Sequence, residues 1–224
     1  HQLSTRRFGG PPHGFVATVE SPAAGVWRAG LVVDGDMQTC KRFKVRKNRI
    51  RLRGKRAIDE SSVWTTYRRW TPHLEDLYSL WIELLFAAPI DQEPTWSALH
   101  VVLQDPTRNL LYDHLSIGED TPGRRARRLK PDCADFPYFL RGYFAWKLSL
   151  PFGYRRCWQG RRHSVAHCQE AQFNDQPAQE SEPADAFFRL LKRGVGWAVN
   201  SSNGRTAYNS KESDFYPIPI TRHS

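Results

Sequence analysis

The spacing of apolar residues changes once along the chain, and this change determines the expected fold class. Up to about residue 52 apolar and polar residues alternate, for example over residues 27–33, which is the two-residue period of a half-buried strand. From Leu74 onward apolar residues recur at steps of three and four, which is the period of an amphipathic helix. The sequence therefore predicts an α+β protein that begins with a small β module and continues into a helical middle.

Turn signals divide the alternating segment into three predicted strands. They lie at residues 21–25 and at Asp34-Gly35-Asp36, and the third strand runs through Cys40, which we expect to be a buried small side chain. Three such strands form a small meander that needs support from the rest of the chain.

Helical spacing, capping residues and prolines predict three helices in the middle of the chain. Thr71 is expected to cap the first of them, with Pro72 at its first position. The three helices are expected between Thr71 and Pro89, between Pro94 and Pro106, and between Leu110 and Gly118.

The last third of the chain is predicted to hold two helices followed by strands. One helix follows Asp132, and Leu140, Phe144 and Leu148 continue its apolar stripe after Phe136. The other is expected over residues 183–193, with Gly194 as its stop. Strands are then expected at residues 195–199, 205–209 and 215–220. The chain is thus predicted to consist of a flexible lead (1–12), a β module (13–60), and a helical segment with a second α+β core (61–224).

The net charge of +10 at pH 7 comes from one segment. Residues 41–56 contain ten of the 33 basic residues and no acidic residue, so the other 23 basic residues balance the 23 acidic ones. Such a run can bind an anionic polymer, or it can be a solvated basic strand and loop. Phe43 is the single aromatic residue within it, so nucleic-acid binding by base stacking is disfavoured. The candidate polyanion-binding residues are Lys41, Arg42, Lys44, Arg46, Lys47, Arg49, Arg51 and Arg53.

Cys133 is the candidate catalytic residue, because it follows a polar loop and precedes the helix of aromatic residues. The N-terminus of a helix carries partial positive charge, which favours a thiolate over a thiol. Asp132 opposes this effect by its charge, although it can instead cap the helix. A cysteine at a helix start can equally be a buried structural residue, and the residues alone leave both alternatives open.

The peptide Asp132-Cys133-Ala134-Asp135 before a helix of aromatic residues resembles the start of the nucleophile helix in NlpC-type cell-wall cysteine hydrolases of the papain-like superfamily. Asp135 replaces a small residue of the family pattern, and Pro137 interrupts the helix. The resemblance implies a helix packed against an antiparallel sheet that follows it in sequence and supplies a histidine. It also implies a cysteine peptidase or amidase acting on peptidoglycan peptides, with Cys133 as nucleophile and the N–H groups of Cys133 and Ala134 near the oxyanion.

No predicted strand after Cys133 carries a histidine, because His163 and His167 lie in a loop and His223 lies in the terminal tail. We therefore expect a papain-like sheet that is truncated at the C-terminus, with the general-base histidine missing and no imidazole within reach of the Cys133 sulfur. The last strand, residues 215–220, is then expected to have an unpaired edge. The alternative function is a non-catalytic envelope-binding module with the same fold.

Cys157, His163, His167 and Cys168 are four potential zinc ligands within twelve residues. Their spacing matches no standard zinc finger and nearby arginines repel a cation, so no metal and no cofactor is predicted. A Cys157–Cys168 disulfide and two free thiols are the alternatives favoured over zinc, and the disulfide would suit an exported protein.

Asp113, Glu119 and Asp120 with His114 could suggest acid–base chemistry, but we interpret His114 as a helix-end or core-edge histidine. The expected partner is a cell-wall peptide or another anionic envelope polymer, and an exported or cell-envelope location is favoured. No stretch approaches 18 consecutive apolar residues, so no transmembrane segment is predicted.

Overall fold

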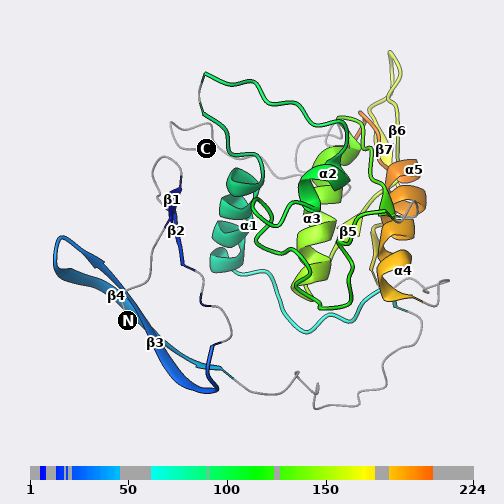
Figure 1. Ribbon diagram of the computed structural model, residues 1–224. Coiled ribbons are helices and arrows are strands. Elements are labelled where there is room, and N and C mark those ends of the chain that lie inside the picture. Colours follow the sequence, from blue (N-terminus) through cyan, green and yellow to red (C-terminus); the bar gives the residue numbers. More distant parts are fainter. Residues whose placement is uncertain are drawn as a thin grey trace. The chain divides into compact units, whose positions relative to one another are not determined.

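The structure, a computed structural model, divides into two compact units (Figure 1). One contains His1–Arg7 and His13–Ala57, and the other contains Phe8–Pro12 and Ile58–Ser224. The residues described are 6–8, 14–17, 19, 22–45, 62–89, 91–123, 127–174 and 182–203. The strands predicted at 205–209 and 215–220, with the expected unpaired edge, lie outside these ranges.

The first unit is built on a long hairpin. Strand β3 (Gly25–Val33) pairs with the antiparallel strand β4 (Asp36–Val45), and Val33 lies opposite Asp36. The predicted turn at Asp34-Gly35 is confirmed, because both residues have the positive φ (53° and 91°) that a two-residue hairpin turn requires.

The hairpin is not part of the predicted three-stranded meander. Strand β2 (Gly14–Val16) pairs instead with β1 (Arg6–Phe8), which lies within the segment expected to be a flexible lead. Cys40 on β4 is exposed rather than buried, because a two-stranded ribbon has no interior that could cover it.

The second unit is centred on one buried helix. Trp81 stacks on Tyr143 with ring centroids 5.7 Å apart, and Trp146 stacks on Phe187 at 4.0 Å. These two contacts join three helices, and the middle one lies between the other two in Figure 1. The helices are α1 (Pro72–Leu85), α3 (Asp135–Lys147) and α4 (Pro183–Arg189), with α3 in the middle.

Two of the predicted helices in the middle of the chain are confirmed. The Thr71 hydroxyl accepts a hydrogen bond from the Leu74 N–H at 3.3 Å, and Pro72 is the first residue of α1. The next helix, α2 (Leu99–Leu103), is shorter than predicted and begins after Ala98.

The strand predicted at residues 195–199 is wrong, because the last helix does not stop at Gly194. It continues from α4 as a π-helical segment, η2 (Leu190–Val195), and then as α5 (Gly196–Ala198). Gly194 lacks the positive φ of a helix-ending glycine. Packing requires a glycine at position 194, because a Cβ atom there would lie 2.7 Å from the Tyr154 hydroxyl.

The helix predicted between Leu110 and Gly118 is also wrong. Consecutive turns replace it, and Asp113, Ser116 and Gly118 have positive φ of 45°, 56° and 64°. Such values interrupt a right-handed helix.

Short antiparallel ladders follow α3, so the α+β class is confirmed. Cys157 lies opposite Cys168 in one of them, and a disulfide joins the two residues. The pairs are β5 (Gly153–Tyr154) with β8 (Gln172–Phe173), and β6 (Cys157–Trp158) with β7 (His167–Cys168).

The disulfide should stabilise the second unit. It closes a loop over a sequence separation of 11 residues, so removing it by the double substitution Cys157→Ala and Cys168→Ala should lower the free energy of unfolding by about 3 kcal/mol. Urea unfolding of both proteins measures this difference. An unchanged free energy would mean that the hydrogen bonds of the hairpin suffice without the cross-link.

Candidate functional site

Cys133 lies in the turn that leads into α3. The Phe136 N–H donates to the Asp132 carbonyl at 3.0 Å, so this turn is already helical in its hydrogen bonding. Asp132 Oδ1 accepts from the N–H groups of Ala134 and Asp135 at 2.8 and 2.9 Å, which confirms the predicted capping role. Cys133 is thus held at the positive end of the central helix.

The same cap corrects the predicted oxyanion site. Because the Ala134 N–H donates to Asp132, it is not available to an oxyanion, and of the two predicted donors the N–H of Cys133 remains. Pro137 is the third residue of α3, so it lies in the first turn, where a missing N–H is tolerated.

The Cys133 thiol is exposed and takes part in no disulfide. None of the histidines within the described ranges forms a hydrogen bond with it. His100 Nδ1 lies 3.1 Å from the Leu129 carbonyl oxygen, and the His167 ring stacks on Trp158 with centroids 5.1 Å apart. His223 lies outside the described residues.

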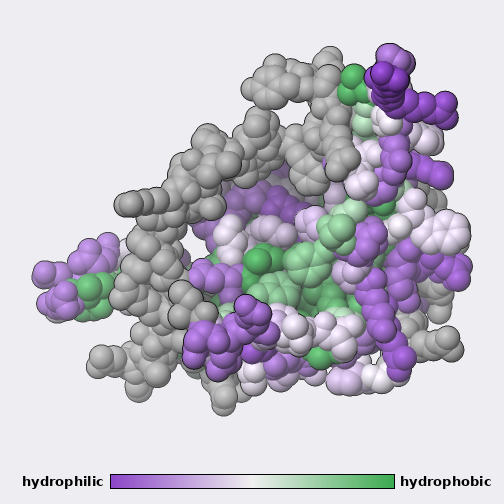
Figure 2. Space-filling view, turned by 90° about the horizontal axis from the view of Figure 1, so that it is seen from above, coloured by the Kyte–Doolittle hydropathy of each residue, from purple (hydrophilic) through white to green (hydrophobic). Residues whose placement is uncertain are grey.

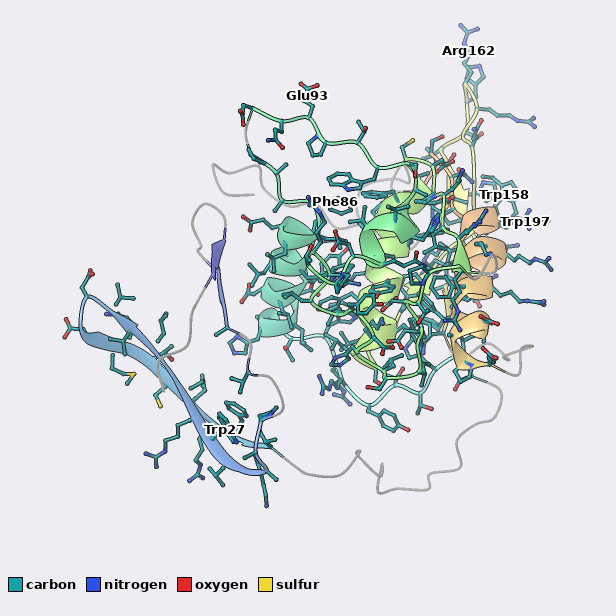
Figure 3. All side chains as sticks on the ribbon, viewed as in Figure 1. Trp27, Phe86, Glu93, Trp158, Arg162 and Trp197 are labelled. Carbon is teal, nitrogen blue, oxygen red and sulfur yellow. A yellow bond between two sulfur atoms is a disulfide. The ribbon has the colours of Figure 1, made fainter. Side chains whose placement is uncertain are left out.

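An aromatic cluster lies at the same end of α3. Phe136 follows Cys133 by three residues, so the two side chains share one helix face. The Phe136 and Phe86 rings are 5.7 Å apart, and the Phe86 and Trp96 rings are 5.5 Å apart. Figure 3 places Phe86 at the upper end of α1, and Figure 2, which looks onto the molecule from that side, shows apolar residues gathered near its middle. The aromatic cluster therefore begins one helical turn after Cys133 in the chain.

Three of the predicted polyanion-binding residues are described. Lys41, Arg42 and Lys44 lie on β4, and all three are exposed. They belong to the first unit, whereas Cys133 belongs to the second. The other five, Arg46, Lys47, Arg49, Arg51 and Arg53, lie outside the described residues.

The Cys157 and Cys168 sulfur atoms are bonded to each other, so they are not zinc ligands. Within the described part of the chain, no group of three or more His, Cys, Asp or Glu side chains is arranged to hold a metal ion.

A buried ionic cluster, made of Lys147, Glu119 and Asp120, lies in the second unit. The Lys147 ammonium group at the end of α3 donates to Glu119 Oε1 and Asp120 Oδ2, and the three side chains are at most 2% exposed. The Tyr143 hydroxyl donates to Asp120 Oδ2 at 2.8 Å, and Asn109 Nδ2 donates to the Tyr143 oxygen at 2.8 Å. A buried charge is tolerated when it is paired and hydrogen-bonded in this way.

The carboxylates of this cluster also bind the backbone of the preceding loop. Glu119 accepts from the N–H groups of Leu115 and Ile117 at 2.9 and 3.2 Å, and Asp120 accepts from the Asp113 N–H at 2.8 Å. Because side chains take up these N–H groups, the segment forms turns in place of the predicted helix.

Sequence reasoning grouped Glu119 with Asp120 but missed Lys147 as their partner, because Lys147 is 28 residues from Glu119 in the chain. One signal was present. Lys147 follows Phe144 by three residues, which puts a lysine on the apolar face of the predicted helix.

The pKa values of the two carboxylates in the cluster are shifted in opposite directions. Burial raises the pKa of Asp120, against the opposing charge of Lys147. Burial also acts to raise the pKa of Glu119, but hydrogen bonds with Asp113 and Lys147 outweigh it and lower that pKa to about 2. The pKa of Asp113 is raised by its hydrogen bond with Glu119. Since the cluster is closed to solvent, we assign it a structural role.

No helix within the described residues is both long and apolar enough to cross a bilayer. The sequence matches no protein-family model, and no curated protein or solved structure is significantly similar to it. The resemblance to NlpC-type hydrolases therefore rests on the residues around Cys133 alone.

The pKa of Glu119 predicts a pH-dependent stability. Its value in the folded protein, about 2, lies below the ordinary value of 4.5, so its contribution is present above about pH 4.5 and is lost as the pH falls towards 2. Urea unfolding at pH 6 and pH 3 should show that Glu119→Gln is less stable than the wild type at pH 6, with a smaller difference at pH 3. Glu83→Gln, at an exposed position of α1, is the control. If Glu119→Gln lowers the free energy of unfolding by the same amount at both pH values, the lowered pKa of Glu119 is contradicted.

Proposed function

We propose that this protein is a cysteine hydrolase of amide bonds, with Cys133 as the nucleophile. The observation that carries the proposal is an exposed, unbridged thiol in the turn that leads into the central buried helix. The partial positive charge at a helix N-terminus stabilises a thiolate, which is the reactive form of cysteine.

The rigidity of the helix supports a catalytic position for this thiol. Tyr143, Phe144 and Ala145 of α3 are fully buried, so the helix cannot shift without disturbing the core. A nucleophile that is held still loses less entropy when it reaches the reacting carbon. The finer architecture that we propose is a papain-like core, in which α3 is the nucleophile helix and the antiparallel strands after it belong to the sheet.

The proposed reaction has two steps. The Cys133 thiolate attacks the amide carbonyl, and the amine leaves with a proton as an acyl-thioester forms. Water then hydrolyses the thioester, which releases a carboxylic acid and restores the thiol. Both steps need proton transfer by an imidazole, and no described histidine is hydrogen-bonded to Cys133. We therefore expect acylation by activated esters but no turnover of peptide amides by this chain alone.

The proposed substrate is a peptide of the cell wall. The apolar surface formed by Phe86, Trp96 and Phe136 would hold side chains of such a peptide beside the thiol. The disulfide supports an exported or cell-envelope location, because disulfides persist in oxidising compartments.

The two free cysteines allow a matched test, because Cys133 and Cys40 are both exposed. In the single variants Cys40→Ser and Cys133→Ser, the remaining thiol is alkylated with iodoacetamide between about pH 6 and about pH 9. We expect Cys133 to react about tenfold faster than Cys40 near pH 6, since both are accessible and one alone lies at a helix start. Asp132→Asn keeps a capping oxygen but removes a negative charge, so it should speed the reaction of Cys133 further.

Mass spectrometry after incubation with an activated ester should find the acyl group on Cys133 and not on Cys40. Equal alkylation rates of the two thiols across the pH range, with no acyl adduct, would overturn the hydrolase proposal.

The second candidate function is a non-catalytic envelope-binding module. Two observations favour it: the Ala134 N–H is already bonded, and Lys41, Arg42 and Lys44 form an exposed basic row on β4. An anionic wall polymer would be the ligand, and added salt should weaken its binding steeply. Replacing the three residues by glutamine should reduce this binding, and unchanged binding would exclude the row as the binding surface.

A further inference from the structure

A second basic surface lies on the disulfide-closed hairpin of the second unit. The fifteen residues 155–169 include four arginines, two histidines and no acidic residue. Arg161 and Arg162 are exposed at the turn of the hairpin, and Arg156 is exposed at its base. No ion pair within the described part of the chain involves these three side chains.

Two exposed tryptophans belong to the same unit as these charges, and Trp158 lies beside Arg156. Trp158 is 39% exposed, its ring stacks on His167 at 5.1 Å, and the Arg156 guanidinium lies 5.8 Å from the ring centroid. Trp197 on α5 is 80% exposed, which leaves an indole almost wholly in solvent. Figure 3 shows Trp158 and Trp197 on the same side of the second unit, with Arg162 at the far end of the hairpin. We call Arg156, Trp158, Arg161, Arg162, His167 and Trp197 the hairpin surface.

The hairpin surface is held rigidly. The disulfide closes the hairpin, and backbone hydrogen bonds join Arg161 and Ser164 in both directions at 2.9 and 3.0 Å. Its base is tied to the chain after α5, because Asn200 Nδ2 donates to the Cys157 carbonyl at 2.7 Å and Asn203 Nδ2 donates to the Arg155 carbonyl at 3.0 Å. A surface that is ordered before binding loses less entropy when it binds a ligand.

We propose that the hairpin surface binds an acidic polysaccharide. The planar guanidinium group of arginine matches carboxylate and sulfate groups with two parallel hydrogen bonds. An exposed indole offers a flat apolar face on which a sugar ring can stack. A chain of acidic sugars presents both features in repetition, and it can lie along the arginines from the turn to the base of the hairpin.

A membrane fits this surface less well. Insertion into a bilayer needs apolar residues at the tip of the inserted element, whereas the tip here is Arg161, Arg162 and His163, with Val165 as the one exposed aliphatic residue of the hairpin. Single-stranded nucleic acid binds along a succession of free aromatic faces. The Trp158 ring already has His167 and Arg156 beside it, which leaves Trp197 as the single largely free indole of this surface.

The test uses the full chain, with a heparin octasaccharide as the probe. Binding is followed through the indole N–H resonance of Trp197, assigned by Trp197→Ala, because Trp197 belongs to the hairpin surface whereas the basic row of β4 belongs to the other unit. We expect Arg161→Gln with Arg162→Gln to weaken this binding about tenfold. The slope of log affinity against log salt should fall by about two. The matched control is Arg68→Gln with Arg69→Gln, an equally exposed arginine pair of the same unit, which should leave both values unchanged.

Three results would overturn the proposal. One is a Trp197 resonance that heparin does not shift, and another is equal affinity of the two double variants for heparin. The third is tighter binding of phosphatidylglycerol vesicles or a single-stranded oligonucleotide than of heparin at equal charge. None of these results depends on Cys133, so they leave the proposed hydrolase function to its own test.

Discussion

The second unit depends on the ion pairs that the buried ammonium group of Lys147 forms with Glu119 and Asp120. The ammonium group neutralises Glu119 and shares Asp120 with the Tyr143 hydroxyl, all within the core. The same carboxylates hold the N–H groups of the loop, so one buried charge joins α3 to a segment without regular secondary structure. Removing one partner of such a cluster leaves an unpaired buried charge, which costs about 3–5 kcal/mol.

The core positions the first of the two proposed activities directly. Cys133 precedes the first turn of α3, and Lys147 ends the same helix, so the thiol is attached to the best-buried element of the unit. The hairpin surface is fixed separately, by the disulfide and by Asn200. A thiol for amide chemistry and a surface for acidic sugars would suit a protein that works on an envelope polymer.

The sequence predicted correctly those features that depend on residues close together in the chain. The Thr71 cap, the Asp34-Gly35 turn and the apolar stripe of α3 follow from neighbouring residues, and the structure confirms them. The wrong predictions concern positions whose structure depends on residues far away in the chain. Gly194 is a typical helix stop by sequence, but the Tyr154 hydroxyl makes it a packing position. At the candidate site, the Asp132 cap was predictable, whereas the loss of the Ala134 N–H as an oxyanion donor followed from the geometry of that cap.

The claim that buried carboxylates organise the loop is tested most directly by hydrogen exchange of the wild-type protein. The amides of Asp113, Leu115 and Ile117 belong to no helix or strand, yet each donates to Glu119 or Asp120. We predict that they exchange as slowly as the amides of α3, because opening them requires the core to open. Exchange at the rate of an unprotected loop would contradict the account.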